Sequence, residues 1–339
     1  MLSMPHLNSF SLKKLTQSFF LLTVLFLLLS QTALAHHTKE SQEKFAAWVK
    51  NLRQDALAAG VSQETLDKAL TTLKAPEPKV IQSYKKQPER KYKLQDYVNN
   101  RVTPLRLDEG RVMMQRYADD LERIEQQYRV QKRFLVALWG LESSYGRNAG
   151  KRPVIQSLAT LAYNKRRTHY FRKELIEALK ILDAGHVTLD EMKGSWAGAM
   201  GPFQFMPTSY THYAVDGDGD GRIDIWSSVP DALASAANYL KEARWKYDQT
   251  WGRPVQLPES FDTSLSGLKK RRPLSRWQSL GVRRTNGEPL PQRNLKSALI
   301  IPDGKAGPAY LVYANFKALR RWNKSNSFAV TVGTLADSY

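Results

Sequence analysis

The sequence contains no cysteine. Disulfide bonds, thiolate metal sites, a cysteine nucleophile and a lipid carried on a cysteine are therefore excluded. Acidic residues are also few relative to basic ones. The sequence has 32 Asp and Glu and 51 Lys and Arg, which gives a formal net charge of +19. An excess of this size predicts an anionic partner such as nucleic acid, a membrane surface or an acidic polysaccharide, although a solvated basic surface that aids solubility is an alternative.

Long apolar runs are confined to the N-terminus. Lys13 and Lys14 precede the run from Phe19 to Leu29, and a small-residue motif ending at Ala35 follows it, as in a secretory signal peptide. The run is shorter than the ~20 residues that a membrane-spanning helix needs. We therefore predict a signal peptide over residues 1–35, cleaved near Ala35, and an exported protein without a transmembrane segment. Without its two lysines the rest of the chain has a charge of +17, and export argues against a nucleic-acid partner.

Several enzyme signatures are missing as well. The sequence has no Gly-x-Ser-x-Gly, no Walker loop and no His-Glu-x-x-His motif, and of its six histidines only His36 and His37 are adjacent. The usual signatures of a serine hydrolase, a P-loop nucleotide-binding enzyme and a zinc metalloprotease are therefore absent. We expect no organic cofactor.

Apolar residues at helical spacing run through most of the remaining chain. Ser62 can cap a helix, residues 109–130 have the pattern of one amphipathic helix, and the next helix, residues 132–144, is apolar nearly all round. The weakly periodic segment 76–106, with its four prolines, predicts a connector. Between residues 252 and 308 proline and glycine are frequent and apolar runs are short, which is typical of a small β-containing region.

One carboxylate, Glu142, stands at the end of this apolar helix. The flanking Trp139, Leu141 and Tyr145 would reduce its solvation, and the C-terminal end of a helix carries partial negative charge. Both effects favour the protonated form, which suits a general acid near neutral pH. Taken alone, however, the segment favours a half-buried structural carboxylate paired with an arginine.

The segment KGSWAGAMGPFQFMPT, which begins at Lys193, combines small, aromatic and polar side chains. Its small residues let the backbone approach a ligand closely, and Gln204 offers both a donor and an acceptor. Trp196, Phe203 and Phe205 can stack on the apolar faces of sugar rings, so the segment predicts a groove for an uncharged polymer backbone. A packed contact between small residues and core aromatics is the alternative, and it leaves Gln204 unexplained.

The segment DGDGDGRID, residues 216–224, matches the first nine positions of an EF-hand calcium loop. The predicted ligands at positions 1, 3, 5, 7 and 9 are Asp216, Asp218, Asp220, the Arg222 carbonyl and Asp224. Position 12 is Ser227 in place of the bidentate glutamate, and we expect Asp231 to supply a late carboxylate. Acids this close repel one another without a cation, so we predict a structural calcium ion, with a metal-free acidic turn as the alternative.

Arg166 and Arg167, followed by His169 and Tyr170, form a compact basic segment. It could hold carboxylate or lactyl groups of an acidic ligand. A solvated corner between two helices explains it equally well.

Taken together, these segments resemble the lytic murein transglycosylase B family. The matching blocks are residues 139–146, 159–162, 166–167, 170–171, 194–201, 204–210, the acidic loop and 237–240. The resemblance implies a mainly α (α+β) fold with a lysozyme-like core, a helical outer lobe and a small β-containing insertion. The implied parts are a signal peptide (1–35), a helical outer lobe (36–130), the catalytic core with the EF-hand-like loop (131–250), a small β lobe (251–310) and C-terminal helices returning to the core (311–339).

The resemblance also implies cleavage of the β-1,4 bond between N-acetylmuramic acid and N-acetylglucosamine, with formation of a 1,6-anhydro-muramyl end. Glu142 would be the single catalytic residue, protonating the glycosidic oxygen and then removing the proton of the muramyl C6 hydroxyl. The implied substrate-binding residues are Arg166, Arg167, Ser195, Trp196, Ala197, Met200, Gln204, Phe205, Met206, Tyr239, Tyr313 and Asn315. Trp196 stands where this family is expected to have Phe, and the larger ring could alter a saccharide subsite.

Two alternatives remain for the same residues. One is a peptidoglycan hydrolase of the lysozyme type on the same scaffold, and the other is a non-catalytic, calcium-stabilised cell-wall-binding protein. In each case the partner is the peptidoglycan glycan strand, and we expect a periplasmic monomer. Protein partners, stem-peptide preference and endo versus exo action do not follow from the sequence.

Overall fold

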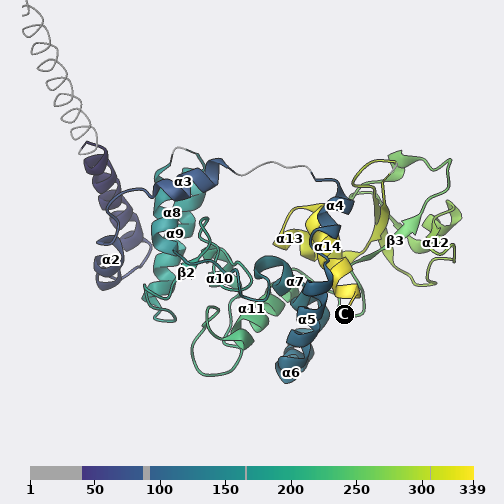
Figure 1. Cartoon of the computed structure of the whole chain (residues 1–339), viewed down its shortest axis with the longest axis horizontal. Coiled ribbons are helices and arrows are strands. Elements are labelled where there is room, and N and C mark those ends of the chain that lie inside the picture. The colour runs from purple at the N-terminus through teal and green to yellow at the C-terminus, as the bar shows by residue number, and fades with distance from the viewer. Residues whose placement is uncertain (1–39, 87–91, 165, 306) are drawn as a thin grey trace, which may run out of the picture. The chain divides into compact units, whose positions relative to one another are not determined.

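The computed structural model describes residues 40–86, 92–164, 166–305 and 307–339 (Figure 1). The chain divides into two compact units, Met1–Pro76 and Glu77–Tyr339. The predicted signal peptide, residues 1–35, lies outside the described residues. Within the part of the chain that the structure describes, no helix is both long enough and apolar enough to cross a membrane.

The described part of the first unit contains two helices, residues 40–58 and α2 (Gln63–Leu70). The Ser62 hydroxyl accepts a hydrogen bond from the Thr65 N–H at 3.2 Å, which satisfies one of the free amides at the start of α2. The predicted helix cap is therefore confirmed. Each helix buries an apolar face, with Phe45 and Leu66 completely buried.

The second unit is mainly helical, as predicted. Its helices are α3 (Pro78–Lys85), α4 (Leu94–Asn99), α5 (Pro104–Arg116), α6 (Ala118–Tyr128), α7 (Lys132–Ser143), α8 (Val154–Tyr163), α9 (Thr168–Asp183), α10 (Pro207–Tyr213), α11 (Val229–Glu242), α12 (Leu274–Ser279), α13 (Ala314–Trp322), α14 (Asn326–Asp337) and the 3₁₀ turn η1 (Thr263–Leu265). The expected connector at 76–106 contains the short helices α3 and α4, and proline stands at the first position of both α3 and α5, where a missing N–H costs nothing.

The single helix expected over residues 109–130 is divided in two. Tyr117 leaves the helical conformation, with φ −113° and ψ 32°, so that α5 ends and α6 begins there. The Tyr117 ring packs edge-on against Trp139 of α7, with the centroids 5.6 Å apart. The prediction of one continuous helix was wrong because this tertiary contact, and not local periodicity, sets the direction of the chain.

Helix α7 lies at the centre of the second unit. Its residues from Phe134 to Gly140 are all buried, and α5, α6, α11 and α14 pack around it. α7 ends where Ser144 and Tyr145 adopt left-handed conformations, with φ 51° and 58°.

A five-stranded antiparallel sheet runs from residue 252 to residue 312 and so extends two residues past the β lobe expected over 251–310 (Figure 1). Its strand order is β4-β6-β7-β3-β5, with β3 (Gly252–Gln256), β4 (Arg271–Pro273), β5 (Arg283–Arg284), β6 (Lys296–Ile300) and β7 (Ala309–Val312). Its core includes Trp277 of α12 and Leu311 of β7, both completely buried. A separate two-stranded ladder pairs β1 (Arg152–Pro153) with β2 (Lys193–Gly194) and brings the start of the groove segment next to α8.

Gly333 of α14 lies against the indole of Trp251. A Cβ atom added at Gly333 would stand 2.2 Å from the Trp251 ring, so Gly333→Ala should lower the free energy of unfolding by about 1–3 kcal/mol. Chemical unfolding followed by circular dichroism measures this change. As a control, Gly333→Ala combined with Trp251→Phe should cost less than the sum of the two single substitutions, because the smaller ring makes room. If the loss in free energy of unfolding of the double variant equals the sum of the two single losses, the close contact between Gly333 and Trp251 is contradicted.

Candidate active site

Glu142 lies in the last turn of α7, and its carboxylate accepts a hydrogen bond from Trp322. The distance from Trp322 Nε1 to Glu142 Oε1 is 2.8 Å. Trp322 is the last residue of α13 and stands 180 positions further along the chain. Beside Glu142, the Ser143 hydroxyl donates to the Pro202 carbonyl oxygen at 2.6 Å, which fixes the end of α7 against the predicted groove segment.

The protonation of Glu142 is set by its burial. Loss of solvation raises the pKa of Glu142 from 4.5 to about 7, and the hydrogen bond from Trp322 opposes part of the rise because it stabilises the carboxylate. No second carboxylate of the described residues contributes to this shift. A single carboxyl group with a pKa near neutral can both donate and accept a proton under the same conditions.

Aromatic rings enclose the indole that contacts Glu142. The Trp322 centroid lies 4.7 Å from Tyr239, 5.3 Å from Phe205 and 6.1 Å from Phe203. The Tyr239 hydroxyl donates to the Arg321 carbonyl oxygen at 2.8 Å, which connects α11 to the end of α13. These contacts orient the indole N–H and help to exclude water from one side of the carboxylate.

Tyr97 of α4 lies within reach of the charge of Glu142. Burial raises the pKa of Tyr97, the positive charge of Arg101 lowers it, and the negative charge of Glu142 raises it, which places both charges near the phenol. Arg101 Cζ lies 3.6 Å from the centroid of the Tyr97 ring. Sequence reasoning missed Tyr97, Arg101 and Trp322 because none of them belongs to a motif, and Tyr97 falls in the segment expected to be a connector.

The predicted groove segment folds into a compact loop in which Met200 forms β-bridges with Gly194 and with Phe205. The Met200 side chain is completely buried and that of Phe205 is 3% exposed. Phe205 packs on Trp322, so it supports the site from the protein side. Both residues were predicted to contact substrate, and their side chains are buried within the loop, so that any contact they make would come from the main chain or from a small part of the side chain.

Other residues of this loop keep part of their surface exposed, namely Ser195, Trp196, Ala197, Gln204 and Met206. Ser195 Oγ accepts a hydrogen bond from the Ala199 N–H at 3.1 Å. Gln204 has a left-handed backbone, with φ 53°, and its amide nitrogen donates to the carbonyl oxygens of Ala149 and Gly201 at 2.9 and 3.0 Å. These bonds fix the Gln204 amide, and its oxygen accepts no hydrogen bond from the described residues.

Arg166 and Arg167 lie with aromatic rings at the junction of α8 and α9, and both are exposed. Arg166 Cζ is 5.8 Å from the ring centroid of Tyr84, and Arg167 Cζ is 4.6 Å from that of Tyr170. The Tyr84 ring also approaches Trp196, with 6.2 Å between centroids. The structure therefore brings the predicted basic pair to the outer end of the groove loop.

Two predicted residues lie elsewhere. The Asn315 side chain is completely buried, and its amide accepts from the Lys246 N–H and donates to the carbonyl oxygens of Lys246 and Gln249 at 2.7–2.8 Å. The Asn315 amide thus holds the turn after α11, and the predicted substrate contact of Asn315 stays a prediction. The Tyr313 side chain is 4% exposed, and its hydroxyl accepts from Arg253 Nε at 2.7 Å, which again indicates a structural role.

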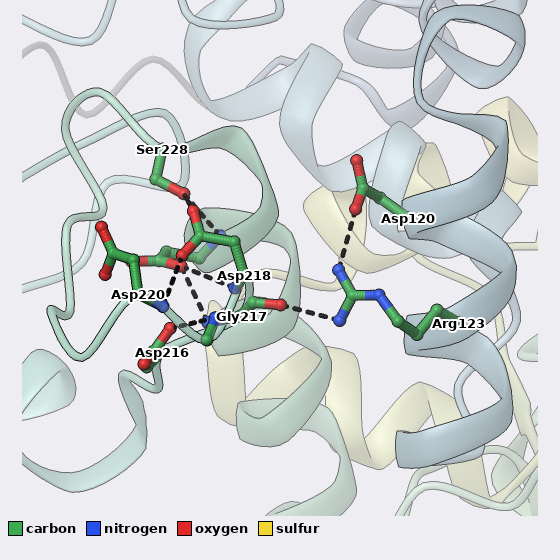
Figure 2. Close-up of polar contacts among 9 residues, drawn as sticks. Asp120, Arg123, Asp216, Gly217, Asp218, Asp220 and Ser228 are labelled. Atoms are coloured by element: carbon green, nitrogen blue, oxygen red, sulfur yellow. Dashed lines mark hydrogen bonds and ion pairs between the residues drawn. The ribbon is translucent and has the colours of Figure 1, made fainter.

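The acidic loop brings together three carboxylates, those of Asp216, Asp218 and Asp231, whose oxygen atoms lie within 4.8 Å of one another. Calcium binds oxygen ligands at about 2.3–2.6 Å, so three oxygens at this separation fit a shared ion. Figure 2 shows the loop, and it also shows Arg123 of α6 donating to the Gly217 carbonyl oxygen at 2.7 Å.

The remaining predicted ligands lie outside this group of three. Asp220 accepts from the Arg222 N–H at 2.7 Å. Asp224 accepts from the N–H groups of Trp226 and Ser227 at 2.9 and 3.0 Å. These carboxylates are engaged in short-range turns of the loop, as is common for Asp in such segments.

Helix α11 connects the acidic loop to Glu142. Near its start, the buried Asp231 accepts from the N–H groups of Gly217 and Asp224 at 2.7 and 2.6 Å, which folds the loop onto the helix. Further along the same helix, Tyr239 packs on Trp322. The loop is therefore part of the framework that positions the aromatic rings around the carboxylate.

The raised pKa of Glu142 predicts a pH-dependent penalty on stability. The unfolded chain ionises near its ordinary pKa and the folded one near 7, so stability falls as pH rises through this window, by about 3 kcal/mol at most. Glu142→Gln removes the penalty, because the amide stays neutral. The variant should unfold at a higher temperature than the wild type at about pH 9 and at a similar temperature at about pH 4.5. A difference that is equal at both pH values would contradict the buried carboxyl.

Comparison with known proteins identifies relatives of this chain. A family model described as "Transglycosylase SLT domain" matches residues 44–337. Membrane-bound lytic murein transglycosylase B of Escherichia coli (strain K12) is 36% identical over 243 residues, which are 70% of this chain. The chain spans 64% of the length of that relative.

Solved structures agree with this match. SltB3 from Pseudomonas aeruginosa, in complex with NAG-anhNAM-pentapeptide, is 45% identical with a TM-score of 0.84, covering 87% of this chain and 79% of SltB3. The Escherichia coli lytic transglycosylase Slt35 in complex with calcium is 28% identical with a TM-score of 0.72, covering 88% of this chain and 92% of Slt35. The family model covers more than half of the chain, so the chain belongs to the transglycosylase SLT domain family.

Proposed function

We propose that this protein is a peptidoglycan lytic transglycosylase that cleaves the bond between N-acetylmuramic acid and N-acetylglucosamine and leaves a 1,6-anhydro-muramyl end. The observation that carries the proposal is the single carboxyl of Glu142, whose pKa burial raises to about 7. Membership of the family supports it, as does the NAG-anhNAM-pentapeptide bound by the related SltB3. A lysozyme-type hydrolase is the alternative function, and the chemical ends of the reaction products distinguish the two.

One carboxyl group suffices for both halves of this reaction. Protonated Glu142 donates its proton to the glycosidic oxygen as the bond to the muramyl C1 breaks. The oxocarbenium-like centre is stabilised by the substrate's N-acetyl group and by nearby dipoles, since no second carboxylate in the described part of the chain contributes at Glu142. The ionised Glu142 then removes the proton of the muramyl C6 hydroxyl, whose oxygen bonds to C1. The carboxyl thereby regains its proton and the cycle closes.

Exclusion of water decides between the anhydro product and hydrolysis. Trp322, with Phe203 and Tyr239 packed on it, covers one side of the Glu142 carboxylate. We assign the substrate contacts to those predicted residues of the groove loop that keep part of their surface exposed. Among them, Ser195 and Gln204 would form hydrogen bonds with the sugars. Arg166 and Arg167 would bind acidic groups of the polymer, because a guanidinium pairs well with carboxylates.

We also propose that the acidic loop binds a structural calcium ion through Asp216, Asp218 and Asp231. The three close carboxylates and the packing of Asp231 against the loop backbone support this. The calcium complex of the related Slt35 is consistent with it. When bound, the ion would neutralise the carboxylates and stiffen the loop on α11. The sequence pattern of residues 1–35 supports a further proposal, that the protein works in the periplasm.

Substitution of Glu142 tests the catalytic proposal. Glu142→Gln should reduce formation of anhydro-muropeptides from sacculi by about 10²–10⁴-fold, because the amide can neither give nor take the proton. Mass spectrometry of the digest measures this product. Wild-type kcat/KM should fall as pH rises through about 7, since the acid form of Glu142 is then lost. Glu64→Gln, an exposed carboxylate of the first unit, is the matched control and should keep full activity.

Two results would contradict the assignment. Products that carry reducing ends instead of anhydro ends would indicate a hydrolase. Unchanged anhydro product from Glu142→Gln would remove Glu142 from the mechanism.

Chelation tests the calcium proposal. Calcium added to chelator-treated protein should raise the Tm by about 5 °C, because a ligand that binds only the folded state stabilises it. Asp218→Asn removes one of the three carboxylates and should lose most of this rise. Asp262→Asn, which removes a carboxylate in the β-containing region, should retain it. A wild-type Tm that does not respond to calcium would rule the site out.

A further inference from the structure

A basic pocket lies between the sheet and α13, away from the Glu142 carboxylate. Its volume is about 270 Å³. Lys269 and Arg271 line it from β4 and the preceding loop, and Lys317 and Arg320 line it from α13. No salt bridge neutralises any of these four cations among the described residues. A hollow lined by four unneutralised cations predicts an anionic ligand.

Main-chain carbonyl groups hold both guanidinium groups of the basic pocket. Arg271 Nη2 donates to the Lys296 carbonyl oxygen at 2.7 Å. Arg320 donates through Nε and Nη2 to the Lys324 carbonyl oxygen at 3.2 and 2.9 Å. A neutral carbonyl orients an arginine without cancelling its charge, and each guanidinium keeps other N–H groups for a ligand.

The floor of the basic pocket is apolar. Val312 is 2% exposed and Phe316 1% exposed, and Ala298 completes the surface between them. The hydroxyl of Tyr313, which also lines the pocket, already accepts from Arg253. The lining includes no Asp, Glu, Asn or Gln, so sugar hydroxyls would find few acceptors there. The pocket therefore suits a small anion joined to an apolar chain.

We propose that the basic pocket binds the C-terminal carboxylate of a short peptide with small apolar side chains, and that in the cell wall this peptide is a stem peptide of peptidoglycan. The proposal rests on the function proposed above. The carboxylate pairs with Lys269, Lys317 and the guanidinium groups, and alanine-sized side chains cover Val312 and Phe316. The volume lies near the lower end for ligand sites, which fits the end of a peptide and not a whole sugar chain.

The geometry of α13 relates the basic pocket to Glu142. Lys317 and Arg320 are three residues apart and share one face of the helix. Trp322 follows Arg320 by two residues, or about 200°, and so points to the opposite face, where it contacts Glu142. The helix with its side chains is ~10–12 Å thick, and an extended peptide of five residues spans up to ~17 Å. The half circumference of the helix is therefore about as long as a fully extended stem peptide, so only the carboxyl end of a stem peptide on a muramyl residue near Glu142 would reach the pocket.

Ligand-observed NMR of the whole protein tests binding directly. Alanine tripeptide with a free carboxylate should bind the wild type about tenfold more tightly than its C-terminal amide. Lys269→Ala combined with Lys317→Ala should weaken binding of the free acid by about tenfold, since two charged partners are lost. Lys305→Ala, an exposed lysine outside the pocket, is the matched control and should change nothing. Equal binding of acid and amide, or acetate or inorganic phosphate binding as tightly as the peptide, would overturn the proposal.

Kinetics on two glycans connect the pocket to the reaction. With peptide-bearing glycan strands the double lysine variant should raise KM by about fivefold and leave kcat unchanged, because the contact is remote from the bond that breaks. With strands freed of peptides by an amidase, KM should equal that of the wild type. An equal rise in KM on both glycans would overturn the peptide assignment. If the wild type cleaves neither glycan, the proposed function fails, while the NMR titration still decides whether the pocket binds a peptide carboxylate.

Discussion

The hydrogen bond from the Trp322 indole to the Glu142 carboxylate joins two helices of the second unit that are 180 residues apart in the chain. Glu142 ends the buried central helix α7, and Trp322 ends α13, which follows the five-stranded sheet. Burial of this carboxyl raises its pKa toward neutrality. The hydrogen bond from the indole stabilises the ionised carboxylate and so opposes part of this rise. The close packing of α14 on both α7 and α13 is what fixes the two ends relative to each other.

Helix α11 extends this framework to the acidic loop. Asp231 near its start binds loop N–H groups, and Tyr239 further along packs on Trp322. Arg123 of α6 supports the loop from the other side through the Gly217 carbonyl (Figure 2). No carboxylate of the loop contributes to the pKa of Glu142, so a cation in the loop would act on the site through the packing of α11 and of the groove segment, to which Trp226 donates at Lys193.

The basic segments of the chain divide into separate surfaces with different neighbours. Arg166 and Arg167 lie among aromatic rings at the outer end of the groove loop, where sugars can stack and acids can pair. Lys317 and Arg320 line a pocket with an apolar floor on the face of α13 opposite to Trp322. The large positive charge of the sequence is thus more than a solvated basic surface. The four cations just named lack acidic partners among the described residues, which leaves them able to bind anionic groups.

The sequence by itself determined the mainly helical fold, the Ser62 cap, the buried central helix and Glu142 as the one carboxyl at its end, because apolar periodicity and capping are local properties. It did not determine which groove residues face outward: Met200 and Phe205 are buried, and Asn315 satisfies main-chain groups. Only the tertiary structure decided that Trp322 contacts Glu142, that the Glu142 charge acts on Tyr97, and that Tyr117 breaks a helix. Such contacts join segments far apart in the chain, and no local pattern encodes them.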